Sequence, residues 1–187
     1  RASVAKEKGL EPLADLLFGF TLKGVDLSEV AKDYIDAEKG VETVEDALQG
    51  ASDIIAEIIS DSAEARKLLK ELIDKTGIVR SLAKKEEDSV YSMYYDYSEA
   101  VKKIPSHRIL AINRGENEEF LKVSVEVNED EAIKILNNLF ITEGSSSTDF
   151  CKESVKDSYS RLIFRSLERE TRSNLTDVAN EQAIKMF

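Results

Sequence analysis

The strongest constraint on the fold is an apolar pattern in the stretch TVEDALQGASDIIAEIIS, residues 43–60. Its apolar side chains recur every three or four residues, the spacing that places them on one face of an α-helix. They are Val44, Ala47, Leu48, Ala51, Ile54, Ile55, Ile58 and Ile59. Thr43 precedes the pattern as an N-cap with Asp46 three residues later, so the sequence predicts a helix with one buried face.

Capping residues predict further helices on either side of this one. Asp26 and Glu29 form a capping-box pattern at the start of VDLSEVAKDYI. Asp61 and Glu64 open another helix, and its inward residues are Leu68, Leu69, Leu72 and Ile73. Gly77 stands where a left-handed C-cap would end that helix.

The remaining helices are predicted from patterns near both ends of the chain. Pro12 lies near the start of a helix over 11–20, and residues 128–141 form a second. After a flexible connection at 144–147, a long helix resumes at Asp149, and Thr176 caps a last one. The fold class is therefore mainly α: a multi-helix bundle with a helix-turn-helix-like part and one or two short β-strands.

The clearest strand is FLKVSVEV, residues 120–127, which alternates between apolar and polar side chains. A single strand needs a partner. The partner is either residues 109–113, ILAIN, in a hairpin, or a segment elsewhere. Residues 109–113 also fit a helix that begins at Ser106.

Four of the six tyrosines gather in the stretch 91–104. The preceding segment, 78–92, reads as a loop with a short turn. Tyr91, Tyr94 and Tyr95 fall on one face if the stretch is helical, and such a cluster could stack on bases. Packing against the core, with the hydroxyl groups at the rim, is the favoured interpretation.

Charge and cysteine content narrow the function. The net charge is −11, whereas domains that bind nucleic acid without sequence preference are usually basic. The single cysteine excludes an internal disulfide and fits a reducing compartment. The sequence has no signal-peptide pattern and no apolar run of the ~20 residues that a membrane helix needs. We expect a cytoplasmic protein, and a piece of a longer one.

The residue patterns do not favour catalysis. The only imidazole is that of His107, and neither Ser106 nor Cys151 lies in a nucleophile motif. One histidine among scattered acids is also a weak metal signal. We therefore expect no catalytic residues, no metal, no cofactor and no small-molecule substrate.

The stretch SHRILAINRG, residues 106–115, combines the histidine with two arginines. Read as a helix, it has Ser106 as cap and Gly115 as its left-handed end, with His107 fixing the first turn through a hydrogen bond. Arg108 and Arg114 then face outward. They can contact phosphate or pair with nearby carboxylates, and pairing is favoured.

A second group of arginines recurs at three- and four-residue spacing, interrupted by Glu168 and Glu170. Its members are Arg161, Arg165, Arg169 and Arg172. With Arg108 and Arg114, they are the candidate contacts for nucleic acid or for a partner protein.

Several long motifs resemble the Tex family of bacterial transcription accessory proteins. They are GLEPLADLL (9–17), EDALQGASDIIAE (45–57), DYSEAVKKIPSHRILAINRGENEEFLKV (96–123), SYSRLI and SLERETR (within 158–172), and ANEQAI near the end. The resemblance implies a helical N-terminal region that precedes an RNase H-like YqgF domain. It also implies nucleic-acid contacts made chiefly by a C-terminal OB-fold.

The resemblance implies an acidic helical subdomain over 1–104 and a helix-strand-helix region over 105–187 that leads toward the YqgF domain. The family usually has a proline just after Ile163, where this chain has Phe164-Arg165-Ser166, so a continuous helix can replace the kink. Two functions remain open. One is a scaffold and interaction region, with RNA, DNA and the transcription machinery as partners of the full-length protein. The other is a direct RNA- or DNA-binding module that uses the arginines at 161–172.

Overall fold

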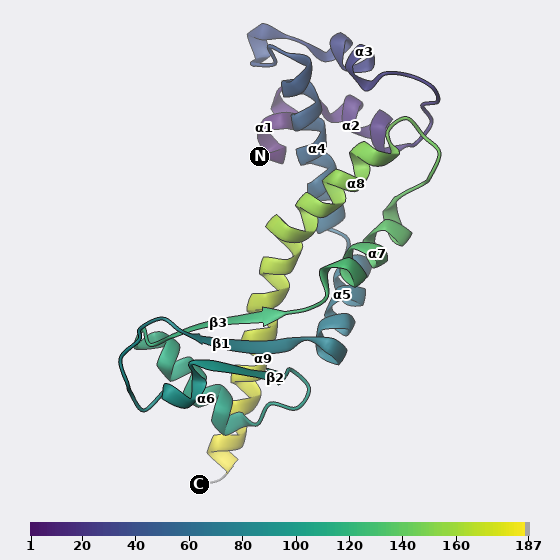
Figure 1. The fold of residues 1–187 in the computed structure, drawn as a ribbon. Coiled ribbons are helices and arrows are strands. Elements are labelled where there is room, and N and C mark those ends of the chain that lie inside the picture. The colour runs from purple at the N-terminus through teal and green to yellow at the C-terminus, as the bar shows by residue number, and fades with distance from the viewer. Residues whose placement is uncertain (186–187) are drawn as a thin grey trace. The chain divides into compact units, whose positions relative to one another are not determined.

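The computed structural model describes residues 1–185 and is mainly helical with one small antiparallel sheet (Figure 1). The chain divides into two units, each built from two separate segments. We call residues 1–66 and 133–164 the helical unit, and residues 67–132 with those from 165 onward the sheet unit. The expected division at 104/105 does not coincide with this partition, because segments distant in sequence pack together within each unit.

The helical unit contains short helices arranged around one long helix. Its elements are α1 (Ala2–Glu7), α2 (Glu11–Phe18), α3 (Leu27–Ala31), η1 (Lys32–Tyr34), η2 (Ala37–Lys39), α4 (Val44–Ser60), most of α7 (Glu129–Phe140), α8 (Thr148–Asp157) and the π-helical η4 (Ser158–Ile163). Two expected caps are confirmed. The Asp26 carboxylate accepts the Ser28 amide at 2.9 Å, and the Thr43 hydroxyl accepts the Asp46 amide at 3.1 Å.

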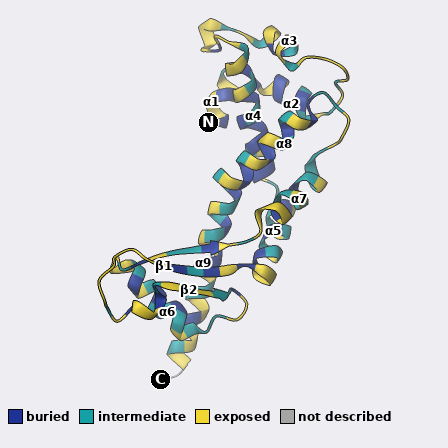
Figure 2. Ribbon diagram, in the orientation of Figure 1, coloured by how far each residue is buried: buried dark blue, intermediate teal, exposed yellow. Residues whose placement is uncertain are grey.

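Helix α4 forms the centre of this unit, as its apolar pattern predicts. Figure 2 shows α4 as largely buried. Its buried residues include Ala47, Ala51, Ile54, Ile55 and Ile59. One member of the pattern was placed wrongly, since the Ile58 residue is 40% exposed. Gly50, Asp53, Ala56 and Ser60 are also buried, so the buried face extends beyond the apolar pattern on its other side.

Buried serines on either side of helix α8 join this part of the chain to the rest of the helical unit. The Ser147 hydroxyl donates to the Leu17 carbonyl at 2.6 Å, and the Ser158 hydroxyl donates to the Ala56 carbonyl at the same distance. The prediction of a flexible connection at 144–147 was wrong, because Ser147 is fully buried and hydrogen bonded.

The sheet unit contains a three-stranded antiparallel sheet in the order β2-β1-β3. Its elements are most of α5 (Ala63–Thr76), β1 (Ile78–Ala83), η3 (Ser92–Tyr94), β2 (Asp96–Ala100), α6 (Ser106–Asn117), β3 (Leu121–Glu126) and α9 (Phe164–Lys185). The predicted strand is β3, and its partner is β1, not residues 109–113, which lie in helix α6. The segment expected to be a loop thus supplies the central strand.

The tyrosine stretch is not the helix that its spacing suggested. It forms the single turn η3 followed by strand β2. Packing is nevertheless its role, because Tyr91 and Tyr94 are buried in one cluster with Ile112 and Leu121.

Two helix ends also differ from the prediction. Gly77 does not have a positive φ; a Cβ there would lie 2.5 Å from the Ile73 carbonyl oxygen, so the close backbone approach requires glycine. No helix begins at Thr176, because α9 is continuous and the Thr176 hydroxyl donates to the Arg172 carbonyl at 2.8 Å. The mainly helical class is confirmed, and the helix-turn-helix-like part stays a prediction.

Candidate interaction surface

Helix α6 carries Arg108 at its start, where the side chain enters a small polar network with strand β2. Arg108 Nη1 donates to the Tyr97 hydroxyl at 2.5 Å and lies 3.7 Å from a Glu99 carboxylate oxygen. The Tyr97 hydroxyl in turn donates to Glu99. The hydrogen bond to Tyr97 raises the pKa of Arg108, while burial and then the bond to Glu99 raise the pKa of Tyr97. Arg108 is therefore engaged within the sheet unit, as the pairing interpretation expected.

His107 and Ser106 do not have the expected capping roles. Pro105 is the N-cap of α6, and no side chain hydrogen-bonds to this end of the helix. The Ser106 hydroxyl instead donates to Gln182 of helix α9. His107 is exposed, and within residues 1–185 its side chain makes no hydrogen bond.

Gly115 is structural, but for a different reason from the one expected. Helix α6 continues past it to Asn117, and the left-handed residue after the helix is Glu119, with a φ of 65°. A Cβ on Gly115 would lie 2.5 Å from the Leu121 Cδ1 atom and 3.0 Å from the Tyr91 ring. Its missing side chain lets α6 pack directly onto the aromatic cluster.

Arg172 joins helix α9 to helix α6. Its Nη1 atom donates to the Glu116 carboxylate at 2.8 Å, and its Nη2 atom donates to the Asn113 side-chain oxygen at 2.9 Å. The Asn113 amide nitrogen then donates to Thr176 at 2.9 Å. The guanidinium group thus has partners on two residues of the neighbouring helix, which is a positioning geometry.

Arg161 belongs to the helical unit and pairs within its own helical segment. Its Nη2 atom lies 2.9 Å from one oxygen of Asp157, and its Nε atom lies 3.1 Å from the other. This two-point contact with the residue four positions earlier raises the pKa of Arg161. Arg161 is held by a carboxylate of the chain.

The other three candidate arginines are exposed. The side chains of Arg114, Arg165 and Arg169 make no hydrogen bond or ion pair with any of residues 1–185. Arg165 and Arg169 both lie on helix α9 in the sheet unit, four residues apart. Three of the six candidate arginines therefore have side-chain partners within the fold. The side chains of the other three are exposed and have no partner among residues 1–185.

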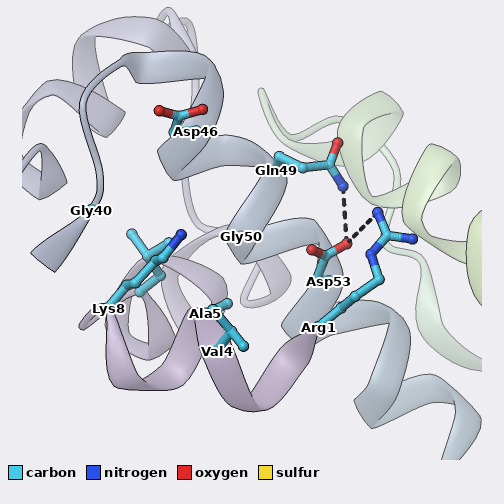
Figure 3. Close-up of a pocket in the computed structure, with 10 residues that line it drawn as sticks. Arg1, Val4, Ala5, Lys8, Gly40, Asp46, Gln49, Gly50 and Asp53 are labelled. Carbon is cyan, nitrogen blue, oxygen red and sulfur yellow. Dashed lines mark hydrogen bonds and ion pairs between the residues drawn. The ribbon is translucent and has the colours of Figure 1, made fainter.

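The helical unit also has a cleft that the sequence did not indicate (Figure 3). It has a volume of about 370 Å³ and lies between α1, α4 and the loop at Gly40. Asp53 on its wall accepts a hydrogen bond from Gln49 Nε2 at 2.9 Å and lies 3.5 Å from Arg1 Nη2. Asp53 is thus already satisfied by side chains of the chain.

The network residues Tyr97, Glu99 and Asn113 were not identified from the sequence. Arg108 lies 9 residues from Glu99 and 11 from Tyr97, and Asn113 lies 63 residues from Thr176. The same holds for Glu168 of α9, which accepts the backbone amide of Val125 at 2.7 Å. Periodicity places each of these residues on an element but does not pair the elements.

No helix within residues 1–185 has the length and apolar character needed to cross a membrane. The chain matches the family described as Tex central region-like over residues 23–187. It is 45% identical to the uncharacterized protein YdcI of Bacillus subtilis, with all of this chain aligned to 27% of that protein.

More distant relatives carry functional names. The transcriptional accessory protein Tex of Neisseria gonorrhoeae is 30% identical, and the alignment covers all of this chain and 25% of that protein. The human S1 RNA-binding domain-containing protein 1 is also 30% identical, over all of this chain and 20% of that protein. The chain thus spans about a quarter or less of the length of these relatives. By its match over residues 23–187, the chain belongs to the Tex family as a Tex central region-like sequence.

Proposed function

We propose that the chain is a non-catalytic scaffold and protein-interaction region of a Tex-like transcription accessory protein that acts in the cytoplasm. The observation that supports this proposal is the state of the candidate arginines. Arg108, Arg161 and Arg172 are held by carboxylates of the chain itself, in a chain with a net charge of −11. Cations that are already paired within the fold contribute little to binding a phosphate backbone.

On this proposal, RNA or DNA is bound by the longer protein, and this region positions other parts or partners such as the transcription machinery. The names of two relatives, a transcriptional accessory protein and an S1 RNA-binding domain-containing protein, support the association with transcription and RNA. Nothing in the proposal requires a cofactor, a metal or a small-molecule substrate.

One observation favours a second function. Arg165 and Arg169 are exposed and unpaired, and residues four apart on a helix lie on the same face. Two neighbouring guanidinium groups can contact successive phosphates, which supports direct nucleic-acid binding by α9.

A salt titration distinguishes the two functions. The chain is titrated with single-stranded RNA and with duplex DNA between low and physiological salt, alongside the variant R165E/R169E. The control K67E/K134E makes the same change in charge at two exposed lysines elsewhere in the chain. The scaffold proposal expects weak binding that both variants reduce equally. Micromolar binding with a steep salt dependence, lost in R165E/R169E and kept in the control, would overturn it in favour of direct binding.

A further inference from the structure

The sheet has two outer edges, and the chain covers them differently. At the β3 edge, the amide of Val125 points away from β1 and is bound by the Glu168 carboxylate of α9 at 2.7 Å. Because unpaired edge groups invite pairing with another chain, this contact protects the β3 edge.

Strand β2 forms the other edge, and its hydrogen-bonding pattern can be assigned. The Ala83 amide donates to the Tyr95 carbonyl at 2.8 Å, so Tyr97, two residues on, also faces β1. In an antiparallel pair, the backbone N–H and C=O groups of every second residue point away from the partner strand. Asp96 and Ser98 therefore direct their backbone amide and carbonyl groups away from the sheet, and within residues 1–185 no backbone or side-chain group binds them.

The side chains along the β2 edge leave room for another strand. Asp96 and Ser98 are exposed, and Ala100 is small and partly exposed. The Asp96 side chain is 83% exposed, and its one ion-pair partner within residues 1–185, Arg80, lies 3.6 Å away. The open edge thus combines free backbone groups, small side chains and a negative charge.

The charges near this edge are mixed, so the backbone groups and Asp96 define what the edge can bind. The loop before β2 contains the exposed acids Glu86, Glu87 and Asp88 together with Lys84 and Lys85, and the exposed Lys102 and Lys103 follow the strand. A row of outward backbone amide and carbonyl groups matches an extended peptide, and a lysine or arginine on that added strand would pair with the exposed Asp96 carboxylate.

We propose that the β2 edge binds an extended segment of a partner protein as a fourth strand, with a basic residue beside Asp96. Backbone hydrogen bonds to Asp96 and Ser98 hold the segment, and its alternate side chains give specificity. This inference rests on the proposed scaffold role and gives that role a defined surface.

Three synthetic octapeptides test the proposal on the full chain. The first alternates threonine and valine with one central lysine, the second has glutamate in place of lysine, and the third has two central prolines. Peptide binding is followed by NMR and by amide hydrogen exchange. We expect the lysine peptide to bind about threefold more tightly than the glutamate peptide, and the proline peptide not to bind. The amides of Asp96 and Ser98 should become protected.

Three variants test whether binding occurs at this edge. Ser98→Pro removes an outward amide that β1 does not use, a position where edge strands accept proline, and should weaken binding about tenfold or more. Ser98→Thr keeps the amide and should bind normally. Asp96→Lys should reverse the preference between the lysine and glutamate peptides, and it decides the matter should Ser98→Pro fail to fold.

Three outcomes would each overturn the β2 proposal. They are protection of the β3 amides in place of the β2 amides, equal peptide binding by Ser98→Pro and Ser98→Thr, and no binding of any peptide at millimolar concentration. None of these outcomes changes the result of the nucleic-acid titration, which tests the scaffold role separately.

Discussion

The two units solve the packing problem in different ways. In the helical unit, small residues let helices approach closely: a Cβ on Gly50 of α4 would lie 2.2 Å from the Leu10 side chain. In the sheet unit, a three-stranded sheet is combined with an aromatic cluster and with polar contacts from α9 such as Arg172 and Glu168. Local periodicity thus predicts the helices of the first unit well, although both units pack distant segments together, while the strand pairing in the second has no local signal.

The largest expected effect tests whether the units are energetically separate. Leu13 of α2 is fully buried in the helical unit, and Leu13→Ala should lower the free energy of unfolding by about 2–5 kcal/mol through lost burial and a cavity. Urea unfolding measures the change, and amide hydrogen exchange should place it in the helical unit.

Val4→Ala is the control for this prediction, because Val4 is 51% exposed and its truncation should change stability by less than about 0.5 kcal/mol. Equal loss of protection in β1 and in α4 would show that the two units unfold as one, and would remove the energetic basis of the comparison.

A glycine in the sheet unit gives the next effect. Gly115→Ala improves helix propensity by about 1 kcal/mol but places a Cβ 2.5 Å from Leu121. Because Leu121 is fully buried, we expect overpacking to dominate, with a net loss of about 1–3 kcal/mol in thermal or urea unfolding. Asn117→Ala, exposed in the same helix, should be neutral or stabilising. A stabilised Gly115→Ala variant would mean that α6 can move away from the cluster freely.

The helices, the strands and Gly115 differ in how far the sequence predicted them. Helix α4, helix α2 and strand β3 follow from periodicity and caps, because their patterns are local. Strand β1 was missed because its inward positions include Ser81, which gives no apolar alternation. Gly115 was recognised as structural, but its role depends on Leu121 and Tyr91, whose positions only the folded chain reveals.

The candidate arginines illustrate the same limit. The spacing of Arg161, Arg165, Arg169 and Arg172 predicted one face of a helix, and pairing with carboxylates was favoured only for Arg108 and Arg114. Arg161 pairs with Asp157 in its own segment, which spacing alone can suggest. Arg172 pairs with Glu116, 56 residues away, and nothing local in the sequence indicates that partner.

Removing the Arg172 side-chain contacts tests how much polar interactions between α6 and α9 contribute to the stability of the sheet unit. Arg172→Gln leaves the Glu116 carboxylate without its cation and weakens the bond to Asn113. We expect a loss of about 1 kcal/mol, reduced from the value for a buried pair because both side chains retain some exposure. The matched variant Arg169→Gln, at an exposed position with no partner within residues 1–185, should leave the urea midpoint unchanged. Equal midpoints for the two variants would contradict a structural role for Arg172.

The smallest effect concerns the two edges of the sheet. Glu168→Met removes the acceptor of the Val125 amide and should cost about 0.5 kcal/mol, since water can replace the lost bond. Exchange of the Val125 amide should accelerate, while Asp96 and Ser98, which already point into solvent, should exchange as before. Glu168→Gln keeps a side-chain oxygen and should preserve most of the protection. If Val125 exchanges at the same rate in Glu168→Met and in the unmodified chain, then the carboxylate does not protect β3, and the difference between the two edges must come from the packing of α9 alone.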